Sequence, residues 1–321
     1  MSRFFRNAVI LAKTEGTYGN DPVPTGVANA LLVSNMSIEQ LNANNVDRNL
    51  IRPFFGASEQ LQGAANVGVS FDIELAGSGT ATTAPAWGPL VLACGMSETV
   101  GASWVEYLPN SLGSTTKSLT FYYHLDGVLH KLLGARGSFS ANMGVGERPI
   151  LSFKFTGLDG GVTAAVNPAA TLTAWKSPLV VSDPNTGDIL LGCSYATGAI
   201  TGGTSYPSKG LTFDLGAEAK HTPLLGGESV NITNRMTKGK ASFDLTAAQH
   251  VTMMTAVKAN TLYTLGMTHG TAAGNIITVF APAVQLSNPA YEDSDGIALN
   301  SFDLVFTPTT AGNDEIRIIT K

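Results

Sequence analysis

Hydrophobic and polar residues alternate along several stretches of the chain, with the two-residue period of a half-buried β-strand. In VSFDIEL (69–75) and ASFDLTA (241–247), Phe and its aliphatic neighbours fall on one face and Asp on the other. Further strand-like stretches follow each of these two: SLTFYYHL (118–125), GVLHKLLGARGSFSAN (127–142) and RPILSFKFTG (148–157) after the first, and TLYTLGMTH (261–269), GNIITVFAPAVQLSN (274–288) and GIALNSFDLVF (296–306) after the second. The pattern predicts an all-β fold with many strands.

Two stretches instead show helical spacing, one after each alternating strand. PAWGPLVLACG (85–95) carries Trp87, Leu90, Val91 and Cys94 on one side. TAAQHVTMMTAVKAN (246–260) begins with a plausible N-cap, Thr246, and places Val251, Met254 and Val257 or Lys258 on its inner side. We therefore predict a minor helical content, with one helix flanking each set of strands.

The same features recur in the same order in the two halves of the chain. SNMSIEQL (34–41) and RPFFGASEQ (52–60) precede the first set of strands, as SKGLTFDL (208–215) and HTPLLGGES (221–229) precede the second. An ordered recurrence indicates a tandem duplication, here of a unit of roughly 120 residues. The predicted division is a first unit at 1–158, a connector at 159–204 with short strands near 178–182 and 188–193, and a second unit at 205–321.

The composition favours a folded protein that makes extensive contacts with other copies of itself. Of the 321 residues 44% are hydrophobic and only 13% are charged, which argues against disorder. The net charge is −5 and no basic cluster is present, so tight binding to DNA or RNA is disfavoured. No apolar segment approaches the roughly 20 residues of a membrane span, and the apolar run after Arg6 is too short for a signal peptide. These features predict folding in a cytoplasm.

A search for catalytic, metal-binding and cofactor motifs yields none. The five histidines lack the spacing of a metal motif, and His124 is interpreted as a side chain on a strand surface. YEDSDGIA (291–298) lacks the later ligands of a calcium loop and is interpreted as a solvated turn. Cys94 and Cys193 lie in small apolar contexts and are expected to be buried free thiols. No enzyme activity, cofactor or metal is expected.

Several longer runs together resemble the major tail tube proteins of long-tailed (siphovirus-like) bacteriophages, with a duplicated tail-tube domain. Among them are ILAKTEGTYGNDPVPTGVANALLVSNMSI (10–38), NLIRPFFGASEQLQG (49–63), LDGVLHKLLGARGSFS (125–140) and LLGGESVNITNR (224–235). The resemblance implies two tandem β-sandwich or rolled-sheet domains, each with one flanking α-helix. It also implies rings whose inner strands close a β-barrel, stacked into a hollow tube that conducts the genome.

The implied partners are other copies of the chain, the tape-measure protein, and tail terminator and baseplate proteins, with DNA passing in transit without tight binding. The implied location is the virion tail, assembled in the host bacterial cytoplasm. Because single-unit members form rings of six, a duplicated chain is expected to form a trimer with pseudo-sixfold symmetry. Two alternatives remain open: a terminator or baseplate hub ring, and a carbohydrate-binding β protein.

The segment NANNVDRNLIRPFFGASEQLQG (42–63) is the candidate for a contact between rings. We interpret it as a long loop in which Phe54 or Phe55 is the central apolar plug, with rim contacts from Arg48, Arg52 and Glu59. The alternative interpretation is an ordinary surface loop with a hydrophobic anchor.

Overall fold

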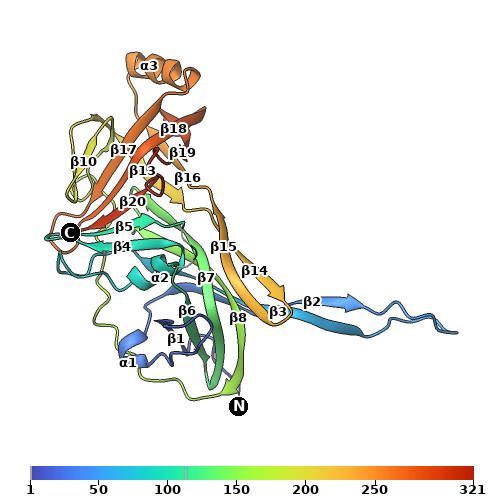
Figure 1. The fold of residues 1–321 in the computed structure, drawn as a ribbon. Coiled ribbons are helices and arrows are strands. Elements are labelled where there is room, and N and C mark those ends of the chain that lie inside the picture. Colours follow the sequence, from blue (N-terminus) through green and yellow to red (C-terminus); the bar gives the residue numbers. More distant parts are fainter. Residues whose placement is uncertain (1, 112, 114) are drawn as a thin grey trace.

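A computed structural model describes residues 2–111, 113 and 115–321, and within these residues the chain is built mainly from antiparallel strands (Figure 1). The strands form one 16-stranded sheet and two small two-stranded sheets. The prediction of an all-β fold with minor helix is confirmed. The elements before residue 165 are β1 (Ala8–Thr14), α1 (Gly26–Asn29), β2 (Ser34–Asp47), β3 (Gln60–Glu74), α2 (Gly88–Ala93), β4 (Met96–Val100), β5 (Val105–Pro109), β6 (Leu119–Leu125), β7 (Val128–Gly144) and β8 (Ile150–Ala164).

The remaining elements include the longest helix, α3, which lies at one end of the molecule, at the top of Figure 1. In order they are β9 (Ile189–Leu191), β10 (Ser194–Ala196), β11 (Ala199–Thr201), β12 (Thr204–Tyr206), β13 (Ser208–Asp214), β14 (Ala217–Leu224), β15 (Gly227–Arg235), β16 (Lys238–Phe243), α3 (Ala247–Lys258), β17 (Leu262–His269), β18 (Ile277–Ser294), β19 (Ile297–Phe306) and β20 (Arg317–Thr320).

The strands of the large sheet follow one order twice. The first half is ordered β1-β6-β7-β8-β3-β2, and the second half is ordered β9-β17-β18-β19-β16-β13. The two halves meet where β13 pairs with β7, with Gly210–Asp214 antiparallel to residues 140–144. Gly210 is required there, because its φ is +98° and a Cβ atom would lie 2.1 Å from the carbonyl oxygen of Met143. This order agrees with the division into two tandem units, which stays a prediction.

One hydrophobic core extends through both halves of the molecule. Stacked rings of Phe153 and Phe155 lie in the first half, and Phe243 packs against Phe302 in the second. Phe213 links the halves, because its ring contacts Phe139 on one side and Phe306 on the other. The inward-facing residues of the alternating strands thus supply the core, as the two-residue period predicts.

Several details of the sequence-based expectations are wrong. Val251 is 64% exposed and Met253 is the buried residue of α3, because this helix projects and contacts the sheet mainly at β18. No strand forms at 178–182; the backbone of Val181 bonds instead to Gly146 and Glu147, in the turn between β7 and β8.

His124 is buried rather than on the surface, because β6 lies between β1 and β7 in the sheet and is covered along its length. Its burial lowers the pKa of the imidazole. Cys94 and Cys193 are buried and free, as expected.

Candidate assembly surfaces

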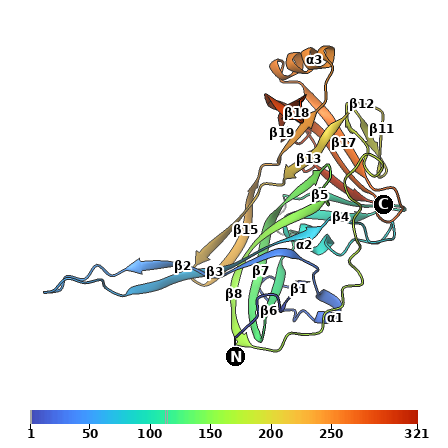
Figure 2. The ribbon, with the colours of Figure 1, turned by 180° about the vertical axis from the view of Figure 1, so that it is seen from behind.

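Two hairpins leave the body of the protein, one from each half of the chain (Figures 1 and 2). We call residues 40–66, the outer part of the β2–β3 hairpin, the first arm, and residues 216–236, the β14–β15 hairpin, the second arm. The first arm projects away from the body, whereas the second arm lies against β7 and β8. Each arm carries one member of the sequence echo near its tip, RPFFG in the first and HTPLLG in the second.

The first arm is a hairpin rather than the long loop that we predicted at 42–63. β2 extends to Asp47 and β3 begins at Gln60, so only the residues between them lie outside the strands. The polar stretch at 42–47 gives no alternating pattern, yet its backbone pairs with β3, with register shifts between Glu39 and Asn42 and between Ala43 and Asn45. The side chain of Gln60 donates a hydrogen bond to Asp47 Oδ1 at the end of the ladder.

All five predicted contact residues lie together at the tip of the first arm. The guanidinium groups of Arg48 and Arg52 both pair with the carboxylate of Glu59. Phe54 is exposed, and Phe55 is 107% exposed. The ion pairs therefore connect the two sides of the tip within the chain, and the aromatic rings project into solvent. A contact with another ring stays a prediction for these residues.

The shaft of the first arm is also unusually apolar for a projecting hairpin. Leu41 and Val46 of β2 are exposed, and so is Leu61 of β3, at 54%. An isolated two-stranded hairpin is at best marginally stable in water, because it has no hydrophobic face to bury. Exposed apolar side chains on such a hairpin indicate a surface that another protein molecule covers.

The apolar shaft of the second arm is covered by other residues of the same chain. The side chain of Val230 is 0% exposed. Arg136 of β7 donates from Nη1 to Val230 O and to Asn231 Oδ1, both at 2.8 Å. The backbone N–H of Val230 donates to Tyr18 Oη, and the guanidinium of Arg136 lies over the Tyr18 ring. At the tip, however, Leu225 remains 108% exposed.

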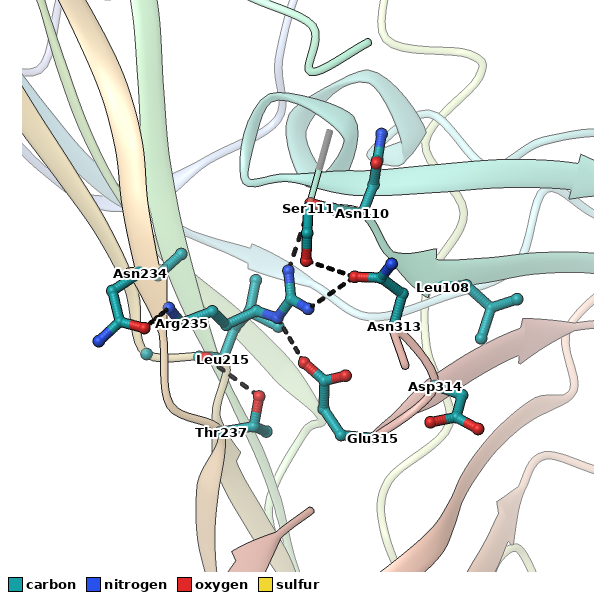
Figure 3. A network of polar contacts seen from close by, with 12 residues as sticks. Leu108, Asn110, Ser111, Leu215, Asn234, Arg235, Thr237, Asn313, Asp314 and Glu315 are labelled. Atoms are coloured by element: carbon teal, nitrogen blue, oxygen red, sulfur yellow. Dashed lines mark hydrogen bonds and ion pairs between the residues drawn. The ribbon is translucent and has the colours of Figure 1, made fainter. Parts of the chain in front are cut away.

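The base of the second arm is fixed by a network of polar contacts (Figure 3). Arg235 Nε donates to Glu315 Oε1, and both side chains are largely buried. Arg235 also donates to the carbonyl oxygen of Asn110 and to Asn313 Oδ1. Ser111 donates to the same Asn313 oxygen. The network thus joins the second arm, the C-terminal loop and the loop after β5.

Several strands of the sheet pair on one side only among the described residues, and we consider two of these edges as assembly surfaces. β2 pairs with β3 on one side only. β18 pairs with β17 on one side as far as Gln285 and with β19 on the other side from Val284, so residues 286–294 have no partner on the β17 side. In the first half the same side of β7 is occupied by β13. An open edge of this kind is a template for pairing with another chain.

A family model of phage tail tube proteins matches residues 6–306 of the chain. The chain belongs to the phage tail tube protein family. It is therefore a structural component of a bacteriophage virion tail. A comparison with curated proteins finds none that matches this tail tube protein.

The described part of the tail tube protein offers no group of three or more His, Cys, Asp or Glu residues placed to hold a metal ion. Asp293 accepts a hydrogen bond from the backbone of Gly296, which gives the turn between β18 and β19 a structural explanation. Burial raises the pKa of the Cys94 thiol, so its reactive thiolate form is disfavoured. None of the helices that the structure describes has the length and hydrophobicity of a membrane-spanning segment.

Sequence reasoning identified the tip of the first arm but missed three other features of the tail tube protein. The open edges of β2 and β18 have no signature in residue type. The docking of the second arm on Arg136 joins residues that are far apart in sequence. The sequence echo contains Leu224 and Leu225 but does not predict that they lie at the tip of a hairpin, as Phe54 and Phe55 do in the first arm.

Proposed function

We propose that three copies of this protein form a closed ring with pseudo-sixfold symmetry, and that the rings stack into a hollow tube through which the phage genome leaves the virion. Each ring closes when β2 of one copy pairs with the open edge of β18 in the next. The observation that carries this proposal is the pairing of β13 with β7 inside the chain.

The internal pairing supplies the geometry for the pairing between copies. β13 and β2 end their respective halves of the sheet, whereas β7 and β18 hold the same place within each half. Ile38 pairs with Val69 and Leu211 pairs with Ala241, in both cases next to the Ser-Phe-Asp sequence. Residues 37–41 of β2 therefore correspond to 210–214 of β13, and they would face the last residues of β18 in the next copy.

When a contact joins two different surfaces of the same protein, each added copy repeats the same rotation, and a ring forms when the last copy meets the first. Each copy contributes two halves that are joined in the same manner, so three copies give a ring of six halves. Closure also gives a partner strand to β2 and to the end of β18, two edges that each separate chain leaves open. A sheet that continues around the ring without a break is a suitable wall for a channel.

The exposed tips are suited to contacts between successive rings. Phe54 and Phe55 would insert into the adjacent ring, with Arg48, Arg52 and Glu59 at the rim of that contact. Burying an aromatic side chain contributes about 2 to 3 kcal/mol, and each ring would present three such tips. This contact would make ring stacking cooperative along the tube.

The remaining partners follow from a tube that has two ends and a filled lumen. A tape-measure protein would occupy the lumen during assembly, and terminator and baseplate proteins would bind the two ends. The net charge of −5 favours the passage of DNA without tight binding. We place assembly in the host bacterial cytoplasm, and we assign the protein no catalytic role.

Electron microscopy of the purified protein, combined with native mass measurement, tests the proposal. Long tubes are expected, whereas a terminator or hub protein would stop at single rings. A second test places a cysteine at Gln40 and another, in turn, at each position from 290 to 294. Oxidation should give disulfide-linked species that end at three chains. If no pair cross-links within assembled rings, the proposed edge pairing is wrong.

The role of the tip is tested by the double variant Phe54→Ser/Phe55→Ser. Both side chains are exposed, so the chain should fold normally and still form rings. Those rings should fail to polymerise. If tubes of normal length form, the tip does not mediate stacking.

A further inference from the structure

The shaft of the first arm has no covering surface within the chain, and the second arm shows where such a surface lies. We propose that, within one ring, the first arm of each copy docks across β18 and β19 of the next copy. That next copy is the one whose β18 edge pairs with β2. This inference rests on the proposed ring and adds a second, separate contact to it.

The second arm provides the in-chain template for this contact. It continues from β13 and crosses β7 and β8, the two strands that follow β13 across the join between the halves. The crossing begins at Gly216, with a φ of +63°, and the backbone N–H of Ala217 donates to Ser138 Oγ of β7 at 3.0 Å. An arm that leaves the terminal strand of one half therefore rests on the neighbouring half.

The first arm has the same connection, and the segments of chain that contain the two arms are nearly equal in length. Glu39 pairs with Gly68 and Thr212 pairs with Lys240, so these pairs enclose residues 40–67 in one arm and 213–239 in the other. The two enclosed segments, 28 and 27 residues long by these bounds, differ by one residue. Register shifts between Glu39 and Asn42 and between Ala43 and Asn45 provide bends where the second arm uses Gly216.

The receiving surface on β18 and β19 is open in the separate chain. Gln285 pairs with Val305 and Ser287 pairs with Asp303, and these side chains are on the opposite face from the buried Leu286 and Leu304. The face therefore offers amide, hydroxyl and apolar groups to an arm that carries Leu41, Val46 and Leu61. It also carries the carboxylate of Asp303, which accepts a hydrogen bond from the side chain of Asn288.

Gln285 occupies a place similar to that of Arg136, which binds the second arm. Arg136 donates to the carbonyl oxygen of Thr116, shortly before β6, and Gln285 donates to Asn260 Oδ1, shortly before β17. Arg136 thus links β7 to the segment before β6, and Gln285 links β18 to the segment before β17. The second amide hydrogen of Gln285 is a donor for the backbone of an arm, as Arg136 is for Val230.

The proposal separates the shaft from the tip of each arm. In the second arm the shaft is buried at Val230 while Leu224 and Leu225 remain exposed. In the first arm, docking of the shaft on the next copy would likewise leave Phe54 and Phe55 free for the adjacent ring. Shaft contacts would stabilise the ring, and tip contacts would join the rings.

Photo-crosslinking in assembled tubes tests this inference. A benzophenone amino acid replaces Leu61 in the full chain, and denaturing electrophoresis and peptide mass spectrometry follow irradiation. We expect crosslinks to residues 277–306 and a ladder that ends at three chains, because contacts within a ring link a closed set. Val46 pairs directly with Leu61 and is the second probe position if the first blocks assembly.

A matched control places the probe at Ile232, which is close to Gly95 of the same chain. This probe should crosslink within the chain and yield no ladder. Crosslinks from position 61 to the first half, a ladder that exceeds the ring size, or no crosslinks in assembled tubes would overturn the inference. A ladder ending at six chains would retain the docking and refute the trimeric ring, and a wild-type protein that forms no rings would refute the proposed function itself.

Discussion

The first and second arms are hairpins that leave equivalent positions of the sheet, within segments of almost equal length. The second arm buries Val230 and is held by Arg136 and Tyr18 of the other half. The first arm exposes Leu61 and Val46 and contacts no comparable surface in the described chain. The difference is that the second arm contacts the neighbouring half of its own chain. The first arm would contact an equivalent half only in the next copy of the ring. The first arm, whose apolar shaft is not covered within the described chain, thus supports an assembly in which another copy covers it.

The largest expected effect comes from breaking the base of the second arm. The change Arg235→Met leaves Glu315 as a buried charge without its partner, which typically costs about 3 to 5 kcal/mol. We expect a loss of this size in the free energy of unfolding of the unassembled protein, measured with urea. The control is Arg148→Met, which removes an exposed pair with Glu74 and should cost less than about 1 kcal/mol. Similar losses in both variants would show that the network does not fix the arm.

The two shafts can be compared by truncating one apolar residue in each. Val230→Ala removes buried methyl groups and should lower the free energy of unfolding by about 2 kcal/mol. Leu61→Ala, on an exposed strand, should change this free energy by less than about 0.5 kcal/mol in the unassembled protein. Ring formation, measured by sedimentation, should nevertheless fail in the Leu61 variant. If the Leu61 variant forms normal rings, the shaft of the first arm is not buried in a ring contact in the way that the second arm is buried within the chain.

The two tips are compared by the double variant Leu224→Ser/Leu225→Ser. Both residues are exposed, so the free energy of unfolding should stay within about 0.5 kcal/mol of wild type. If both kinds of tip contact the next ring, the tubes should be shorter than wild-type tubes in electron micrographs. Tubes of unchanged length would restrict stacking to Phe54 and Phe55.

The smallest expected effect concerns Glu292, near the open end of β18. Hydrogen bonds from Ser242 and Lys209 hold the pKa of this carboxyl below its usual value. Because the folded-state pKa is depressed, the stabilisation is present above the unfolded pKa and is lost as the pH falls through the folded pKa. Ser242→Ala should therefore cost at most about 1 kcal/mol at neutral pH, and the difference from wild type should shrink in acid. If the difference in free energy of unfolding between the variant and wild type does not change with pH, the lost stability does not come from the hydrogen bond to Glu292.

The sequence was sufficient to predict those parts of the structure that depend on local pattern. The two-residue period identified the core strands, whereas the echo between RPFFG and HTPLLG indicated a duplication and did not predict two hairpin tips. The first arm was mistaken for a loop because the polar residues at 42–47 pair only through their backbone. The face of α3 was misjudged at Val251 because the helix contacts little of the sheet. Open edges and the Arg235 network depend on contacts between distant residues, which no local pattern encodes.

Native mass measurement of the smallest closed ring tests the central claim most directly. The Phe54→Ser/Phe55→Ser variant is suited to it, because we expect this variant to stop at single rings. The account predicts a ring of three chains, in which six halves alternate around the channel. A closed ring of six full-length chains would contradict it.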